Sequence, residues 1–233
     1  MQIKATWDNK RFGGDYYQAV RVELVDDSGI HTAKYVDAGQ FLNALNGAGV
    51  KEDNLCRIGK LPQHYYDGAI KRDAEMAISG KVQLIIPPAK TVVQFENTRY
   101  EIPFPALLFF YSIQKGKVTN TEIYALKGGQ WNEKSVLYNY PYGNVNPCSH
   151  SVCWGTNVLP EIADLQKLDV ICSMFYTSPC NNDLYMAGKS TVWKMENLRN
   201  VFEQLKKRQD FPDEILVNSG KGTVGSLWRN FLE

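Results

Sequence analysis

Five apolar runs, each closed by turn-forming residues, follow one another between residues 82 and 126. They are rich in β-branched and aromatic side chains, which favour extended backbone. Prolines and short Gly- or Asn-containing turns separate them, a pattern that predicts an antiparallel β-meander. The predicted strands cover residues 82–86, 91–96, 100–102, 106–113 and 119–126, and a short edge strand is predicted at 135–138.

Beyond residue 160 the apolar residues recur at helical spacing. Ile162, Leu165, Leu168, Ile171 and Phe175 would share one face of a helix. A Ser-Pro step at 178–179 should end it, and a second helix is predicted at 195–208. A sheet followed by helices predicts an α+β fold.

The first part of the chain predicts a smaller α+β extension. Residues 20–25 and 32–36 have the composition of two strands joined by a hairpin turn at 26–29, and Asp37 is a suitable N-cap for a helix ending near Leu45. The apolar residues of 61–80 are spaced as in a helix, although Gly68 weakens that pattern. We therefore predict an N-terminal extension at 1–79 and a main domain at 80–233.

Composition excludes several classes of function. The net charge is +1 and basic residues are scattered, so we expect no nucleic-acid partner. The most apolar stretch, 102–113, contains two prolines and is too short to cross a bilayer, and the first residues lack the apolar core of a signal peptide. Five cysteines, an odd number in a chain of 233 residues, favour free thiols. We expect a soluble cytoplasmic protein.

The residues with the clearest chemical potential lie in the turn-rich stretch 140–157. Cys148, His150 and Cys153 fall within six residues of one another, and Asn144 precedes them. Cys153 stands between Val152 and Trp154, two side chains that can anchor the local backbone by burying apolar surface. A positioned thiol is a better nucleophile than one that is merely exposed, so Cys153 is the predicted nucleophile.

Two neighbours could assist this thiol. A free thiol with a pKa near ~8.5 is only slightly ionised at neutral pH, and His150 could take or relay its proton. The Asn144 amide could donate a hydrogen bond to an oxyanion formed at a carbonyl carbon. Alternatively, Asn144 stabilises the turn and His150 is a solvated loop residue.

A zinc site is the second chemistry that these residues allow. Cys148, His150, Cys153 and Cys180 could supply four ligands, although paired Cys-x2-Cys units are absent from the sequence. A hydrolytic cysteine protease is less well supported, because no second histidine has a suitable context. Cys172 would lie on the apolar face of the predicted helix, in the core.

The order of these pieces resembles the ubiquitin-conjugating enzyme superfamily. Its members carry a meander, a His-Pro-Asn motif, a thioester cysteine about eight residues later, then a helix and a proline-rich turn. Here Tyr140–Pro141 and Asn144 stand near the His-Pro-Asn position, and Cys153 stands at the cysteine step. Residues 175–181 fall where the superfamily turns after its helix.

The sequence is most similar to a bacterial branch, prokaryotic ubiquitin-conjugating-like family D, which includes the B protein of PRTRC systems. The matching stretches are Pro-Ala-Lys-Thr at 88–91, Pro-Ala-Leu-Leu at 105–108, Asn-Val at 144–145 and Val-Cys-Trp-Gly at 152–155. The resemblance covers about residues 80–233, and the cysteine step is its most specific part.

The resemblance implies an acyltransferase that holds a ubiquitin-like modifier as a thioester on Cys153, with Asn144 stabilising the oxyanion and no cofactor needed by this chain. It further implies a ThiF-like activating enzyme, a ubiquitin-like modifier protein and a metal-dependent deconjugating peptidase in one operon, often in anti-phage defence or mobile elements. Two alternatives remain open: a catalytically inactive scaffold that binds a ubiquitin-like partner, and a zinc-stabilised module.

Overall fold

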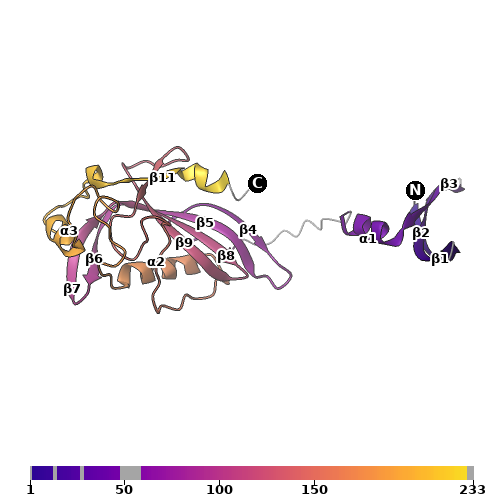
Figure 1. Ribbon diagram of the computed structural model, residues 1–233, viewed down its shortest axis with the longest axis horizontal. Coiled ribbons are helices and arrows are strands. Elements are labelled where there is room, and N and C mark those ends of the chain that lie inside the picture. Colours follow the sequence, from indigo (N-terminus) through magenta and orange to yellow (C-terminus); the bar gives the residue numbers. More distant parts are fainter. Residues whose placement is uncertain (1, 13–14, 27–28, 48–58, 230–233) are drawn as a thin grey trace. The chain divides into compact units, whose positions relative to one another are not determined.

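The computed structural model describes residues 2–12, 15–26, 29–47 and 59–229. The chain divides into two compact units, Met1–Leu55 and Cys56–Glu233 (Figure 1).

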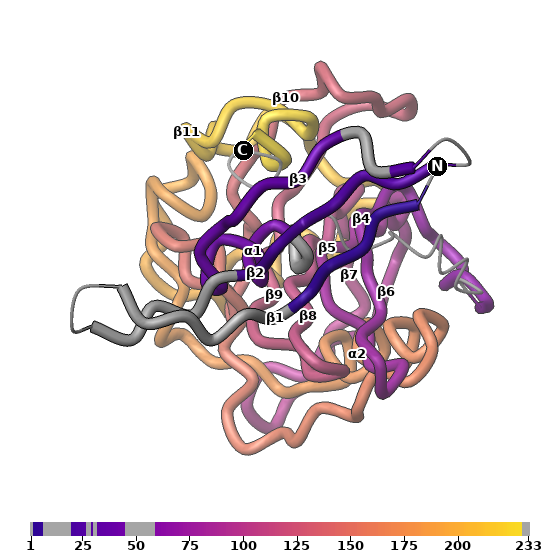
Figure 2. Tube along the Cα trace, turned by 90° about the vertical axis from the view of Figure 1, so that its right-hand side faces the viewer, coloured from indigo at the N-terminus to yellow at the C-terminus, as the bar shows by residue number. Residues whose placement is uncertain are grey.

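The first unit is a three-stranded antiparallel sheet followed by one helix, and its strand order β1-β2-β3 can be followed in Figure 2. The two predicted strands are found in β2 and β3, and β1 is a further strand that the sequence patterns did not indicate. Asp37 caps the helix as predicted, since its Oδ1 atom accepts the Gln40 N–H at 3.0 Å. The elements are β1 (Gln2–Phe12), β2 (Asp15–Asp26), β3 (Gly29–Asp37) and α1 (Ala38–Gly47).

The second unit is built on a six-stranded antiparallel sheet with the order β11-β10-β9-β8-β5-β4, and a separate hairpin pairs β6 with β7. The strands of the predicted meander are all present, but their predicted consecutive pairing was wrong, because β5 pairs directly with β8 and the hairpin β6–β7 lies outside the sheet. The strands of the unit are β4 (Tyr65–Arg72), β5 (Ile78–Ile86), β6 (Ala89–Phe95), β7 (Thr98–Phe104), β8 (Ala106–Gln114), β9 (Lys117–Leu126), β10 (Val136–Asn139) and β11 (Asn218–Thr223). Its helices are α2 (Lys167–Thr177), α3 (Leu198–Leu205), η1 (Asp213–Ile215) and η2 (Val224–Trp228).

The central strand β8 is apolar on both faces because both faces of the sheet are covered. Leu107, Phe109 and Tyr111 face the main core, which includes α2 and α3. Leu108 faces a smaller core that includes Val224 of η2. Figure 1 shows α2 and the C-terminal η2 on opposite sides of the sheet.

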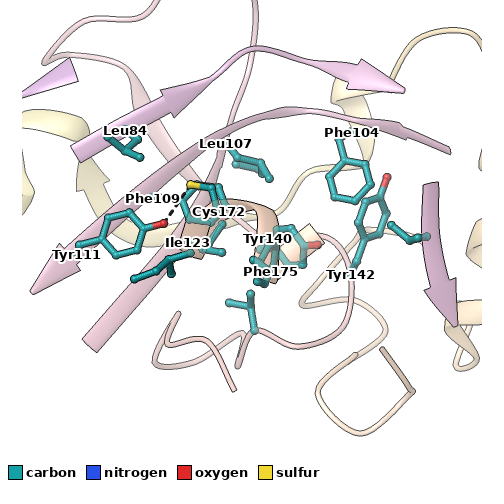
Figure 3. Packing of buried hydrophobic residues seen from close by; sticks show 14 of the residues in the cluster. Leu84, Phe104, Leu107, Phe109, Tyr111, Ile123, Tyr140, Tyr142, Cys172 and Phe175 are labelled. Carbon is teal, nitrogen blue, oxygen red and sulfur yellow. Dashed lines mark hydrogen bonds between the residues drawn. The ribbon is translucent and has the colours of Figure 1, made fainter. Parts of the chain in front are cut away.

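Aromatic side chains fill much of the main core (Figure 3). Phe109 meets the ring of Phe175 from α2 edge-on, with centroids 5.5 Å apart. Tyr111 places its hydroxyl 3.1 Å from the Cys172 Sγ atom, so Cys172 belongs to the core as predicted. These contacts fix α2 against β8.

Helix boundaries differ from the sequence pattern at the ends. Ile162 and Leu165 are buried as predicted but precede α2, which begins at Lys167. The second predicted helix is the shorter α3, which Asn197 caps by accepting the Arg199 N–H at 2.8 Å. The apolar spacing in the sequence therefore identified the residues that these segments bury, whereas local capping determines where each helix begins and ends.

The prediction of a helix in 61–80 was wrong. Residues 65–72 form strand β4, which pairs with β5. A register shift between Tyr65 and Asp67 breaks the two-residue alternation of side chains that marks a strand in sequence. Gly80 permits the close pairing, because a Cβ there would lie 2.1 Å from the Ala69 carbonyl oxygen.

This correction moves the boundary between the two units. The predicted division at 79/80 would separate β4 from the strand with which it pairs, whereas the structure divides the chain after Leu55.

Candidate active site

The candidate nucleophile lies in a segment, residues 140–154, that runs from the end of β10 and is here called the flap. Tyr140 and Tyr142 bury its first part in the main core, and the Tyr142 hydroxyl donates to the Pro103 carbonyl at 2.6 Å. Tyr140, which stands near the superfamily's histidine position, packs its ring on Phe175 and belongs to the core.

The flap closes on itself through a tight turn. Val145 pairs with Val152 in an isolated antiparallel bridge, and the Cys153 N–H donates to the Asn144 carbonyl at 2.8 Å. The Asn146 side chain stabilises the turn, because its Oδ1 atom accepts hydrogen bonds from the backbone N–H groups of Cys148 and Ser149. The flap thus returns to Asn144 just as it reaches Cys153.

Strand β9 holds the second half of the flap in place. The Ile123 N–H donates to the His150 carbonyl at 3.0 Å, and the Val152 N–H donates to the Thr121 carbonyl at 2.8 Å. Beyond Cys153, Trp154 packs edge-on against Phe175, with centroids 6.2 Å apart. Both neighbours of Cys153 therefore pack against the main core, as predicted.

Cys153 is exposed and lines an open cavity of about 500 Å³. The cavity lies between the flap, the β6–β7 turn and the loop that follows α2. Asn144 shares its wall. The other lining residues are Glu96, Trp154, Gly155, Thr156, Asn157, Ser178, Pro179, Cys180, Asn181, Asp183 and Leu184.

Asn144 joins the flap to the loop after α2. It adopts the left-handed conformation, with φ +67°, which asparagine tolerates better than most residues. Its Nδ2 atom donates to the Pro179 carbonyl at 3.0 Å, while its own carbonyl accepts the Cys153 N–H. The structure thus brings Asn144 and Cys153 together, and the Asn144 amide is held by Pro179.

His150 lies elsewhere. It is buried, and it is not among the residues that line the cavity. Its Nε2 atom lies 2.9 Å from Asn139 Oδ1, and its ring stacks on Tyr124 with centroids 4.6 Å apart. It is therefore not the solvated loop residue considered above, and its described contacts are with β9 and β10 rather than with the Cys153 thiol.

The remaining cysteines differ in environment. Cys148 is exposed, and Lys189 Nζ approaches its Sγ atom at 3.6 Å. Burial raises the pKa of the Cys172 thiol to about 12. Burial likewise raises the pKa of the Cys180 thiol to about 12, although Cys180 lines the cavity. Cys56 lies outside the described residues. Cys153 is thus the one cysteine of the described chain that is both exposed and at the cavity.

The ligand arrangement does not support the zinc alternative. Among residues 2–12, 15–26, 29–47 and 59–229, no group of three or more His, Cys, Asp or Glu side chains is placed to hold a metal ion. His150 is directed to Asn139 in the interior, while Cys153 lines the cavity.

Sequence reasoning missed the opposite wall of the cavity. The Asn157 amide donates to Ser178 Oγ at 2.9 Å, and the Asn181 amide donates to Asp183 Oδ2 at 2.8 Å. Glu96 reaches this wall because its N–H donates to the Cys180 carbonyl at 3.0 Å. The Ser-Pro step after α2 was the available signal, since it marks where the chain turns back towards the flap.

An α+β unit that presents one exposed cysteine at a cavity beside a flap is an arrangement suited to acyl transfer through sulfur. The chain matches the model of prokaryotic E2 family D over residues 71–219, more than half of its length. The protein therefore belongs to prokaryotic E2 family D. No curated protein and no solved structure matches it. In the part of the chain that the structure describes, no helix is long and apolar enough to cross a membrane.

Proposed function

We propose that the protein is a conjugating enzyme that carries a ubiquitin-like modifier as a thioester on Cys153. The observation that carries this proposal is the position of Cys153, exposed at the cavity in the family D part of the chain. Exposure admits a large protein substrate, and the packed neighbours Val152 and Trp154 keep the sulfur in place.

The proposed chemistry consists of two acyl transfers. The Cys153 thiolate attacks the thioester carbonyl carbon at the modifier's C-terminal glycine, and the thiolate of a ThiF-like activating enzyme leaves. An acceptor nucleophile then attacks the new thioester, loses a proton to solvent, and Cys153 leaves as a thiolate. The chain needs no cofactor for either step.

Asn144 has a defined part in this proposal. Its carbonyl fixes the Cys153 backbone in the resting state, and its amide is bound to Pro179. The amide could stabilise an oxyanion after exchanging this bond for one to the substrate. We therefore assign Asn144 first to holding the flap and second to the oxyanion.

The cavity wall favours an amine as the acceptor. Glu96 and Asp183 line it, but the Glu96 carboxylate is paired with Arg199, whose Nη2 atom lies 2.7 Å from Glu96 Oε2, so Asp183 is the lining carboxylate for which the structure shows no ion pair among the described residues. The Asp183 carboxylate would attract an ammonium group to the cavity.

The test is a thioester assay with the full chain, ATP, and the ThiF-like enzyme and ubiquitin-like protein encoded beside it. We expect an adduct that thiols cleave, that is absent in Cys153→Ala, and that becomes a thiol-resistant ester in Cys153→Ser. Cys148→Ser, a change at an exposed thiol away from the cavity, is the matched control and should form the adduct normally.

Two results would count against the proposal. An adduct that persists in Cys153→Ala would remove Cys153 as the nucleophile. No adduct under any condition would favour the scaffold alternative, in which the fold binds the modifier without chemistry.

A further inference from the structure

The side chain and the backbone of His150, three residues before Cys153, are both tightly held. His150 is 2% exposed and adopts the left-handed conformation, with φ +63°. Residues in this conformation are rare outside glycine and persist where the surroundings hold them. The surroundings here are Asn139 of β10, which binds the ring nitrogen, and Tyr124 of β9, which stacks on the ring.

Hydrogen bonding fixes which form of the imidazole fits. Asn139 donates its Nδ2 hydrogen to the Lys189 carbonyl at 2.9 Å, so its Oδ1 atom must face His150. Because Oδ1 is an acceptor, His150 carries its hydrogen on Nε2. Nδ1 is buried, and among the described residues it has no hydrogen-bond partner. The site therefore suits the neutral imidazole.

The backbone connects this ring to the nucleophile. The His150 carbonyl accepts the Ile123 N–H, the Val152 N–H donates to Thr121, and the Cys153 N–H donates to Asn144. These three bonds follow one another along residues 150–153. The residue whose ring is held by Asn139 and Tyr124 is thus also the first residue of this series of backbone bonds.

We propose that His150 is a positioning residue that locks the flap onto β9 and β10 and so holds the Cys153 sulfur at the cavity. It acts through the backbone and has no part in proton transfer. The catalytic consequence rests on the proposed function of Cys153, whereas the locking itself does not.

Protonation should release the lock. Burial, assisted by the positive charge of Lys221 on β11 and opposed by the Ser149 backbone, lowers the pKa of His150 to about 4. The Glu122 carboxylate on β9 accepts the Tyr124 hydroxyl at 2.6 Å and the Asn120 amide, whereas the His150 ring nitrogen binds Asn139. Lys189 and Cys148 are the other titratable groups nearby, and Lys189 binds Asn139 through its carbonyl.

The direction of the pH effect follows from the depressed pKa. When the flap is released, His150 regains an ordinary pKa near 6.5 and takes up a proton below that pH. The lock is therefore complete above pH 6.5 and weakens as the pH falls towards 4. Linkage gives about tenfold weaker protection of the flap at pH 5.5 than at pH 7.5.

Hydrogen–deuterium exchange of the full chain tests the lock without any partner protein. His150→Phe keeps a ring on Tyr124 but removes the bond to Asn139, and it should raise exchange at the Ile123 and Val152 amides at least about tenfold. His150→Gln keeps a donor near the Nε2 position and cannot titrate, so it should resemble wild type at pH 7.5. At pH 5.5 the amides of wild type should be about tenfold less protected than those of His150→Gln, because only wild type carries a histidine at position 150 that takes up a proton.

Two further variants make the exchange test decisive. His64→Gln changes a partly exposed histidine of the same unit and should behave as wild type throughout. Asn139→Ala breaks the lock from the other side with His150 intact, and it should loosen the flap as His150→Phe does, which covers the case that His150→Phe fails to fold.

The thioester assay separates positioning from proton transfer. A general base is worth about 10²- to 10⁴-fold, so a catalytic His150 predicts that His150→Gln loses at least about a hundredfold in rate. A positioning His150 predicts that His150→Gln stays within about threefold of wild type at pH 7.5, and that its rate relative to wild type rises at pH 5.5.

The outcomes are distinct. A hundredfold loss in His150→Gln with unchanged exchange would overturn the proposal, as would unchanged exchange in both His150→Phe and Asn139→Ala. A third outcome is possible: the exchange measurements agree with the expectation, but wild type forms no adduct in the thioester assay. That outcome would support the lock and refute the proposed function of Cys153.

Discussion

Gly143 shows how closely the flap approaches the opposite wall of the cavity. A Cβ at this position would lie 2.8 Å from the Asn181 carbonyl oxygen and 3.2 Å from the Cys180 Cβ atom. Backbone atoms cannot move aside as a flexible side chain can, so the flap or the loop after α2 must shift. The absence of a side chain at Gly143 therefore sets the width of the site next to Asn144.

We accordingly predict that Gly143→Ala lowers the free energy of unfolding by about 1–3 kcal/mol, the usual cost of overpacking. Because the shift occurs beside Asn144, alkylation of Cys153 should also change in rate. Gly129→Ala is the matched control, since a Cβ there meets no atom within 4 Å. Equal stabilities of the two variants in urea denaturation would contradict this account of Gly143.

At the level of single residues, the sequence predicted the position of a side chain where neighbours along the chain determine that position. The placing of Cys153 between two anchoring residues could be read from Val152 and Trp154, which do pack on the core. The burial of His150 could not, because it depends on Asn139 and Tyr124 from two other strands. The catalytic assignments of Cys153 and Asn144 remain predictions.

At the level of elements, α2 links the core to the site through one side chain. Phe175 contacts the rings of Phe109, Tyr140 and Trp154, and Trp154 directly follows the nucleophile. The helix therefore supports the sheet and the flap at the same point.

Phe175→Ala should destabilise the protein by about 3–5 kcal/mol, because it removes a buried ring and leaves a cavity. Val170→Ala on the exposed side of the same helix should change stability by no more than about 0.5 kcal/mol. Chemical denaturation of both variants measures the difference. A cost below about 1 kcal/mol for Phe175→Ala would show that the aromatic cluster does not fix α2.

The strands β5 to β9 and both main helices could be predicted from apolar runs and helical spacing, but the pairing of β5 with β8 could not, because it skips the hairpin β6–β7. Strand β4 could not, since its register shift hides the alternation and the apolar spacing of 61–80 indicates a helix instead. Strand β1 also escaped, because charged and polar residues such as Asp8, Asn9 and Lys10 interrupt its apolar ones. Irregular strands depend on pairing with a neighbour, which the sequence does not display.

At the level of the whole molecule, the cavity is assembled from three segments far apart in the chain. Glu96 comes from the β6–β7 turn, Cys153 from the flap, and Asp183 from the loop after α2. Sequence motifs pointed to the flap as the site of the chemistry. They did not show that Glu96 and Asp183 lie beside it, because only the folding of the chain brings these segments together. All three belong to the second unit, which also contains the full extent of the family D match.

Both hydrophobic cores consist of residues between Tyr65 and Leu227, within the second unit. A unit that holds its own core can fold independently. We therefore predict that a chain starting at residue 56 unfolds cooperatively, with its calorimetric midpoint within a few degrees of that of the same transition in the full chain. It should also accept the modifier on Cys153 as the full chain does, because each wall of the cavity is retained. Loss of the cooperative transition would show that Met1–Leu55 is needed for folding. A folded but unreactive chain would instead assign Met1–Leu55 to recognition of the activating enzyme or the modifier.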